Sequence, residues 1–473
     1  MANSYLSKDF TSTPTNAKKF TVSMWFKISR HNANQVLLSN TNASDEFQIL
    51  HASGDYLIVS GFVSGAVTHN IQTDRLFTDC TSWYHLVVAG DSTLSTATDR
   101  LKVYINGERL TNFSSVTNIT QNNDYEINKE MSGTSNGWYV GRNHGGSYFT
   151  GLISHLNNVD GSALAPTVFG ETDSTTGEWK AILSPSVTYG TNGYFLKFEN
   201  SGALGTDSSG NSTTFTVNGN LKQSPDTVSN NFCQLDANQS YDMGNVVYGG
   251  TAYLGTNATA SGAASTQMVK NGKWYFEVKV ETDRTDSDGA TISIAKNGTH
   301  AQRRWRNGGA NAIVGKETGS NGCEGITYQP MTSTPNIIED CGGGTVNYGS
   351  QASANDIIMV AVDLSAATSK IWFGKNGTWF NAPSTSSAGD PANGNYPGLS
   401  FAKGDDFWGI NITAVTNQAN NANKYMYCNF GEGRFGTTAV ASANADGNSV
   451  GAFEYAVPSG FYAICTKNIK DYG

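Results

Sequence analysis

The sequence predicts an all-β protein built from two β-sandwich domains in series. Apolar and polar side chains alternate with a period of two along many short segments, which is typical of strands that bury one face. Turn-forming residues separate these segments, with 52 Gly in 473 residues. No amphipathic helical pattern extends beyond about ten residues. Short strands, frequent turns and scarce helix are typical of sandwiches and barrels, and two large all-β domains fit this length.

The first half of the chain carries a series of such segments. From Phe20 to Ile28, apolar side chains alternate with Thr, Ser, Trp and Lys, so we expect a strand with one buried face. Asn106-Gly107 follows an alternating run and predicts a type I′ hairpin, because both central residues of that turn need a positive φ. The other expected strands are Gln35–Ser39, Glu46–His51, Tyr56–Ser60, Trp83–Ala89, Leu101–Ile105, Trp138–Gly141, Phe149–Leu156, Tyr194–Phe198 and Thr214–Val217, with one short helical turn in Ala163–Phe169.

A segment without periodicity, Asn218–Val228, separates the two halves and predicts domains at residues 1–222 and 223–473. The alternation resumes at Trp274–Val280, and Asn376-Gly377 predicts a second type I′ hairpin. The further strands expected here are Ala290–Ala295, Asp356–Leu364, Lys370–Gly374, Thr378–Asn381, Tyr425–Phe430 and Gly460–Cys465.

Two long stretches of the second half, Gly308–Gln351 and Ala382–Ala414, are rich in Gly, Asn, Ser and Thr. We expect long loops there. Long ordered loops on a rigid β scaffold are common binding sites. The alternative is that they cover sheet faces or lie at subunit contacts.

The composition excludes several classes of protein. Aromatic residues make up 11% of the chain and charged residues 15%, which argues against a disordered chain. The net charge of −9 argues against nucleic-acid binding, which depends on neutralising phosphates. The longest apolar run, Ile357–Val362, is too short to cross a bilayer. The first residues lack an apolar signal core, so we expect cytoplasmic synthesis without ordinary export, and reduced cysteines.

Several segments resemble known families. Phe20–Lys27, Trp83–Val88, Leu101–Glu108 and Tyr148–Ile153 resemble the strands of a concanavalin A-like or laminin-G-like jelly roll. In the second half, Gly272–Val278, Lys370–Trp379, Asn429–Gly431 and Pro458–Phe461 resemble the SPRY domain, which is another concanavalin A-like sandwich. These resemblances imply two concanavalin A-like β-sandwiches.

The tracts Gly161–Lys180, Leu204–Asn211 and Asn230–Leu235 are similar to tailed-bacteriophage proteins that carry this jelly roll at their N-terminus. The resemblance implies a virion structural protein, assembled in the host cytoplasm and placed on a tail fibre, a tail appendage or the capsid surface. The implied partners are other virion proteins and host cell-surface polysaccharide. A homo-oligomer, for which we expect a trimer, would raise weak glycan affinity by multivalency.

Two groups of residues are candidates for binding. Arg303, Arg304, Trp305 and Arg306 place three guanidinium groups around an indole, which suits an anionic glycan or a neighbouring virion protein; alternatively they belong to a surface strand that shields its own sheet. Trp379, Phe380 and Trp408 lie near the expected long loops and are candidates for stacking on sugars. The alternative is that these rings belong to the core.

No catalytic or metal-binding residue is predicted, and no cofactor. Retaining glycosidases need two carboxyl groups about 5–5.5 Å apart, and no strand here carries the matching acidic pattern. Asp283–Gly289 matches only a fragment of a calcium loop. We therefore expect a non-enzymatic protein that presents its loops to host glycans. The alternatives are a purely structural decoration or adaptor protein and, third, a polysaccharide depolymerase.

Overall fold

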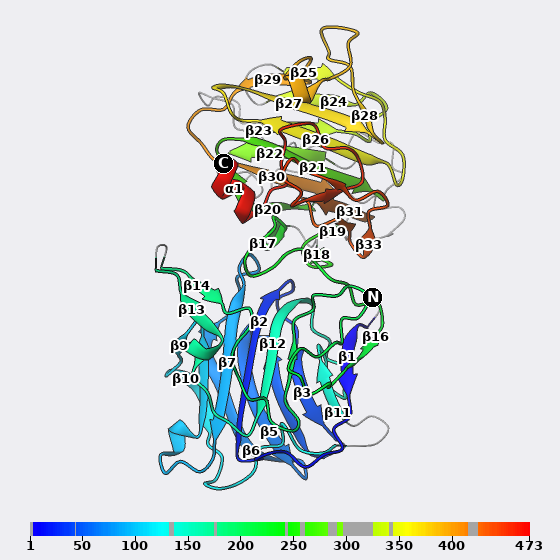
Figure 1. Cartoon of the computed structure of the whole chain (residues 1–473). Helices are drawn as coiled ribbons and strands as arrows, with labels where there is room; N and C mark the ends of the chain where they lie inside the picture. The colour runs from blue at the N-terminus through cyan, green and yellow to red at the C-terminus, as the bar shows by residue number, and fades with distance from the viewer. Residues whose placement is uncertain are drawn as a thin grey trace. The chain divides into compact units, whose positions relative to one another are not determined.

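Strands make up nearly all of the regular structure, as the alternating pattern predicts. The computed structural model describes residues 3–42, 44–131, 137–174, 177–241, 245–255, 261–281, 291–296, 325–339, 344–414 and 424–473. Within these ranges the one α-helix is α1 (Thr466–Tyr472). The chain divides into two compact units, residues 1–229 and 230–473, and each contains two large sheets (Figure 1). The fold is therefore two concanavalin A-like β-sandwiches in series.

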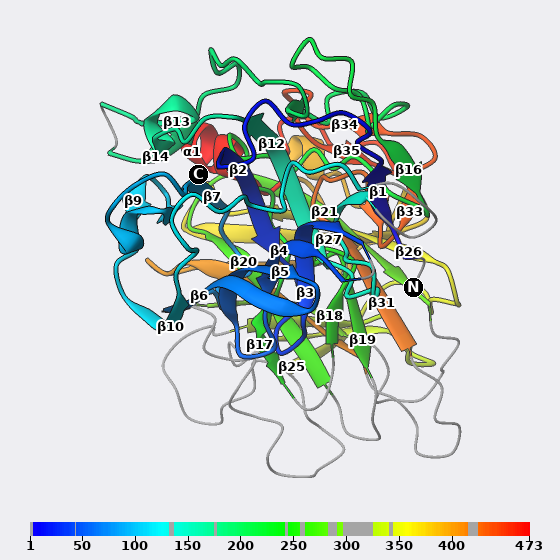
Figure 2. The same ribbon diagram turned by 90° about the horizontal axis from the view of Figure 1, so that it is seen from below.

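The first unit pairs an eight-stranded sheet with a six-stranded sheet. Figures 1 and 2 show β2, β7 and β12 in one layer of this unit and β3 to β6 in the other. The larger sheet has the order β10 (Phe113–Thr117), β6 (Ala66–Leu76), β5 (Tyr56–Val63), β4 (Glu46–His51), β3 (Gln35–Thr41), β11 (Gly137–Val140), β1 (Tyr5–Lys8), β16 (Thr216–Asn218). The smaller has the order β15 (Tyr194–Leu196), β12 (Gly151–Asp160), β2 (Lys19–Ile28), β7 (Tyr84–Asp91), β8 (Leu101–Ile105), β9 (Glu108–Arg109). A separate hairpin joins β13 (Gly170–Thr172) to β14 (Trp179–Ala181), and the short helical turns are η1 (Ala97–Asp99) and η2 (Pro166–Val168).

The second unit pairs a seven-stranded sheet with an eight-stranded sheet. The seven-stranded sheet has the order β17 (Leu235–Tyr241), β20 (Ser261–Val269), β30 (Trp408–Ala414), β22 (Thr291–Lys296), β23 (Gly325–Gln329), β24 (Asn336–Glu339), β25 (Gly344–Asn347). The other has the order β18 (Asn245–Val247), β19 (Ala252–Gly255), β31 (Lys424–Asn429), β21 (Lys273–Val280), β26 (Ile357–Asp363), β27 (Thr368–Lys375), β28 (Thr378–Trp379), with β29 (Leu399–Ala402) also paired to β27. Two hairpins, β32 (Arg434–Phe435) with β33 (Thr438–Ala439) and β34 (Asn444–Ala445) with β35 (Ala452–Phe453), and the turn η4 (Pro391–Asn393) complete the unit.

Both predicted type I′ hairpins are confirmed. Asn106 and Gly107 have φ of 50° and 84° and connect β8 to β9. Asn376 and Gly377 have φ of 50° and 86° and connect β27 to β28. The positive φ that each turn requires explains why Asn and Gly stand there.

The expectation that the strand at Phe20–Ile28 buries only one face is wrong. Every residue of β2 after Lys19 is buried. Its outer face is covered at Lys27 by Asp226, with which it forms an ion pair, and at Thr21 by the segment after β12, where the Thr21 hydroxyl donates to the Ser162 carbonyl and accepts from the Leu164 N–H. A small apolar cluster on neighbouring elements is formed by Val87, Val159, Phe169, Tyr189 and Phe195. Alternation therefore identified the strand but did not show that its polar face is also covered.

The two stretches expected to be long loops also contain strands. Residues 325–347 hold β23, β24 and β25, and residues 399–414 hold β29 and β30. These strands are short or interrupted by polar residues, so their period-two signal is weak. Both stretches contribute to the sheets of the second unit.

Candidate functional site

A cavity of about 400 Å³ opens in the first unit. Its walls come from β1 and β11 of one sheet and from β12 of the other. Two covering segments, residues 197–199 and 221–227, complete the walls. Large, mostly apolar pockets with a few polar groups are the usual places for small ligands.

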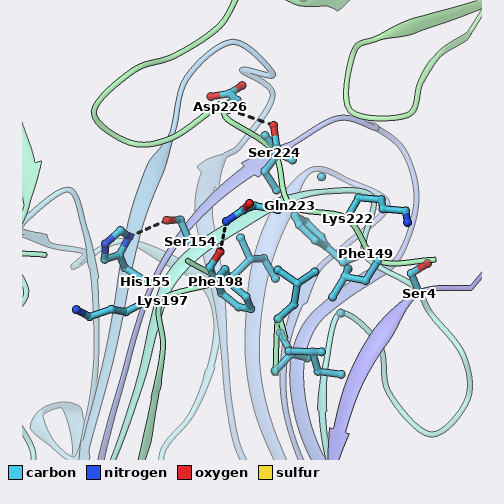
Figure 3. Close-up of a pocket in the computed structure, with 18 of the residues that line it drawn as sticks. Ser4, Phe149, Ser154, His155, Lys197, Phe198, Lys222, Gln223, Ser224 and Asp226 are labelled. Atoms are coloured by element: carbon cyan, nitrogen blue, oxygen red, sulfur yellow. Dashed lines mark hydrogen bonds between the residues drawn. The ribbon is translucent and has the colours of Figure 1, made fainter. Parts of the chain in front are cut away.

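The cavity combines half-buried aromatic rings with polar side chains (Figure 3). Phe149 and Phe198 both line it and are partly exposed. Flat apolar rings of this kind can stack on the apolar faces of sugars, and the neighbouring hydroxyl, amide and amine groups can bond to sugar hydroxyls.

Gln223 ties the two covering segments together. Its Nε2 donates hydrogen bonds to the carbonyl oxygens of Phe198 at 2.7 Å and Glu199 at 2.9 Å, one of which is drawn in Figure 3. Both acceptors and Gln223 itself line the cavity. The amide therefore fixes one wall relative to the other.

His155 has an unusual backbone conformation at the cavity wall. Its φ is 47°, at the point where the pairing of β12 with β2 shifts register between Ser154 and Asn157. A non-glycine residue with positive φ stores strain, and such residues concentrate at functional sites. Its Nδ1 lies 2.7 Å from Ser154 Oγ, and burial lowers the pKa of the imidazole, with a further decrease from Lys197.

A buried ion pair supports the cavity from one side. The side chains of Lys27 and Asp226 are both inaccessible to solvent, with Nζ 3.0 Å from Oδ2. Trp83 Nε1 donates to the other oxygen of Asp226 at 2.9 Å. Trp83 and Asp226 line the cavity. This network attaches the segment 221–227 to the outer face of β2.

The mouth of the cavity carries more positive than negative charge. Lys197, Glu199 and Lys222 are the charged lining residues besides the buried Asp226. Lys197 Nζ lies 3.7 Å from the exposed Glu199 carboxylate. Lys222 is exposed.

Of the binding residues predicted from the sequence, those that the structure describes do not line this cavity. Arg303, Arg304, Trp305 and Arg306 lie outside the described residues. Trp408 is 2% exposed and Phe380 9% exposed, both packed in the core of the second unit. For Phe380 and Trp408 the alternative given above, that these rings belong to the core, is confirmed. Trp408 begins β30, a central strand of its sheet, and Phe380 packs against Tyr328 and Tyr348. Trp379 is half-buried beside Tyr275.

The described histidines and cysteines include residues whose contacts cannot be inferred from their spacing in the sequence. His85 is packed and hydrogen-bonded: Trp179 Nε1 donates to its Nδ1 at 2.9 Å, and its Nε2 lies 2.9 Å from Ser23 Oγ. Cys80 Sγ lies 2.9 Å from Nε2 of His31. The four described cysteines, Cys80, Cys233, Cys428 and Cys465, are buried and form no disulfide bond.

Among the described residues, no three His, Cys, Asp or Glu side chains are arranged to hold a metal ion. Asp283–Gly289 lies outside them. No helix in the described part of the chain has the length and apolar character needed to cross a membrane.

Sequence reasoning did not identify the cavity because its residues come from segments spread between positions 4 and 227. Two signals were available. Phe149 and Phe198 end or begin segments that were recognised as strands, and Lys27 is a charged residue within a strand that is otherwise strongly apolar.

Comparison with known proteins bears on the fold of the first unit. No curated protein matches this sequence. Similar solved structures include the SPRY domain of human HERC1 (14% identity, covering 41% of this chain and 96% of that chain, TM-score 0.26). A second is a candidate carbohydrate-binding protein of Bacteroides ovatus (18% identity, covering 46% of this chain and 57% of that chain, TM-score 0.29). A third is domains LG4-5 of the mouse laminin α1 chain (9% identity, covering 90% of this chain and 84% of that chain, TM-score 0.27). The family model of the concanavalin A-like lectin/glucanases superfamily matches residues 2–168, and the first unit has this concanavalin A-like, laminin-G-like fold.

Proposed function

We propose that this chain is a non-enzymatic structural protein of a bacteriophage virion whose first unit binds host-surface glycan in the cavity between β1, β11 and β12. The observation that carries the binding role is the cavity itself, which places the half-buried rings of Phe149 and Phe198 among polar side chains. The match of residues 2–168 to a lectin and glucanase superfamily supports the same ligand class.

The arrangement of acids favours binding over hydrolysis. Glycosidases use two carboxyl groups that flank the scissile bond. The acidic residues lining the cavity are Glu199 and Asp226. Asp226 is buried against Lys27 and Trp83, so Glu199 is left without a second carboxylate facing the ligand. We therefore propose that the bound glycan is held and not cleaved.

The virion part of the proposal comes from the sequence tracts that are similar to tailed-bacteriophage proteins, Gly161–Lys180 and Leu204–Asn211. A virion displays many copies of its surface proteins, and multivalency would turn weak binding at each cavity into firm attachment. We propose a homo-oligomer, with a trimer as the expected state.

A glycan-array screen of the purified full-length chain tests the binding role. We expect binding to bacterial surface polysaccharides, weakened strongly by Phe149→Ala. Phe113→Ala is the matched control, because it removes another half-buried phenylalanine ring of the first unit that does not line the cavity. No glycan binding by the oligomer would favour a purely structural role. Release of reducing sugar would favour the depolymerase.

A further inference from the structure

A single arginine lies beside the cavity within a cluster of three tyrosine rings. Arg142 follows Gly141, a lining residue, at the end of β11. The centre of its guanidinium is 4.6 Å from the ring of Tyr5, 5.0 Å from Tyr139 and 5.3 Å from Tyr148. Tyr5 also lines the cavity. The cluster therefore adjoins the site proposed to hold glycan.

Hydrogen bonds fix the orientation of this guanidinium. Nε donates to the carbonyl oxygen of Asn143 at 2.7 Å, and Nη2 donates to that of His144 at 2.8 Å. Nη1 donates to the hydroxyl of Tyr148 at 3.3 Å. An arginine has five N–H donors, so these contacts use three of them. The side chain is held in place and still has donors to offer.

No acidic side chain balances this charge within the part of the chain that the structure describes. Arg142 makes no ion pair there; its acceptors are two carbonyl groups and one hydroxyl. The residue is partly exposed, as are Tyr5 and Tyr148. A positive charge thus lies among partly exposed rings.

The positive charge of Arg142 contrasts with the net negative charge of the chain. The chain has a net charge of −9, so attraction of anions is not a property of the whole molecule. A planar guanidinium with free donors matches a carboxylate, which it can bind through two parallel hydrogen bonds. The neighbouring tyrosine rings supply flat surfaces for the sugar ring that carries the carboxylate.

We propose that Arg142 binds the carboxylate of an acidic sugar, so that the first unit selects uronic-acid-containing polysaccharides over neutral ones. This inference rests on the proposed glycan-binding function. Tyr5 and Tyr148 contact the sugar ring, and Arg142 forms an ion pair with its carboxylate.

The test compares a uronic-acid-containing oligosaccharide with its carboxyl-reduced form, which has the same linkages and no charge. Isothermal titration of the full-length protein should show about tenfold weaker binding of the reduced form, because a charge-assisted hydrogen-bond pair is lost. Arg142→Gln should bind the acidic form as weakly as the reduced form. Arg142→Lys should fall between, because it keeps the charge without the planar fork.

Arg75→Gln is the control, since Arg75 also lies over two rings, Phe77 at 5.5 Å and Tyr84 at 5.9 Å, but does not line the cavity. It should bind both forms as the wild type does. Equal wild-type affinity for the two forms would overturn the role of Arg142 and leave the glycan-binding function intact. Binding of neither form at any concentration would contradict both. If Arg142→Gln fails to fold by circular dichroism, the ligand comparison and Arg142→Lys still decide the question.

Discussion

Lys27 is a charged residue on a central strand of its sheet, and it forms an ion pair with Asp226. Its ammonium group and the carboxylate of Asp226 are both fully buried. Removing one partner of a buried ion pair leaves the other charge without compensation. We expect Asp226→Ala to lower the unfolding free energy of the first unit by about 3–5 kcal/mol in urea denaturation.

Lys180→Ala provides the comparison for that variant. Lys180 pairs with Glu171 and Asp173 at 3.3 Å on the surface, where solvent screens the interaction. The variant should unfold as the wild type does. If Asp226→Ala were equally harmless, the buried pair would not anchor the segment that closes the cavity.

Two buried histidines of the first unit make its stability depend on pH. Burial lowers the pKa of His69 to about 4 and that of His85 to about 3, whereas an unfolded histidine titrates near 6.5. Between these values the unfolded chain binds protons that the folded unit does not. Stability is therefore full above about pH 6.5 and decreases as the pH falls toward 4, by up to about 1.4 kcal/mol per pH unit for each histidine.

Urea unfolding at several pH values between 7 and 4 measures this dependence. His85→Gln removes one of the buried titrating groups and should reduce the slope. A slope that is unchanged in this variant would show that His85 has the same pKa in the folded and unfolded chain.

At the scale of elements, the hairpin between β8 and β9 is constrained more tightly than the hairpin between β5 and β6. Gly107 and Gly65 have positive φ of 84° and 76°. A Cβ at Gly107 would lie 2.7 Å from the ring of Trp179, whereas at Gly65 it would meet nothing within 4 Å. Gly65→Ala should cost about 1–2 kcal/mol for its backbone conformation alone, and Gly107→Ala should cost more.

Thermal unfolding of the two variants distinguishes these costs. Trp179 also donates to His85, so displacing its ring disturbs the covered face of the six-stranded sheet. Equal destabilisation would mean that Trp179 moves aside freely and that the β13–β14 hairpin does not hold this face closed.

The sequence pattern predicted strands and turns correctly where the whole signal lies within a few consecutive residues. The alternation of Phe20–Ile28 and the two Asn-Gly pairs are each contained in a few residues, and the structure places β2 and both turns there. Trp408 shows how a signal was missed. Trp408, Ile410 and Ile412 alternate within β30, but Gly, Asn and Ser around them indicated a loop.

The candidate site could not be predicted in the same way. Lys27 and Asp226 are 199 positions apart, and Tyr5 meets Arg142 because β1 pairs with β11. Strand register brings these residues together, and a single sequence does not specify register between distant strands.

At the scale of the whole molecule, each unit has its own core and should unfold on its own. The second unit contains a large central cluster and a second cluster around Tyr275 and Trp372. The buried Glu277 carboxylate there accepts hydrogen bonds from the backbone N–H groups of Glu454 and Tyr455, both at 2.9 Å. We expect Asp226→Ala and Glu277→Gln to lower different transitions in differential scanning calorimetry. A single transition lowered by both variants would contradict independent unfolding.

The central claim is that the cavity of the first unit holds a glycan, and a crystal structure of the full-length chain with a bound acidic oligosaccharide tests it most directly. We predict a sugar ring against Phe149 and Phe198, with a carboxylate on Arg142. A ligand bound only in the second unit, with the cavity unchanged, would contradict the claim.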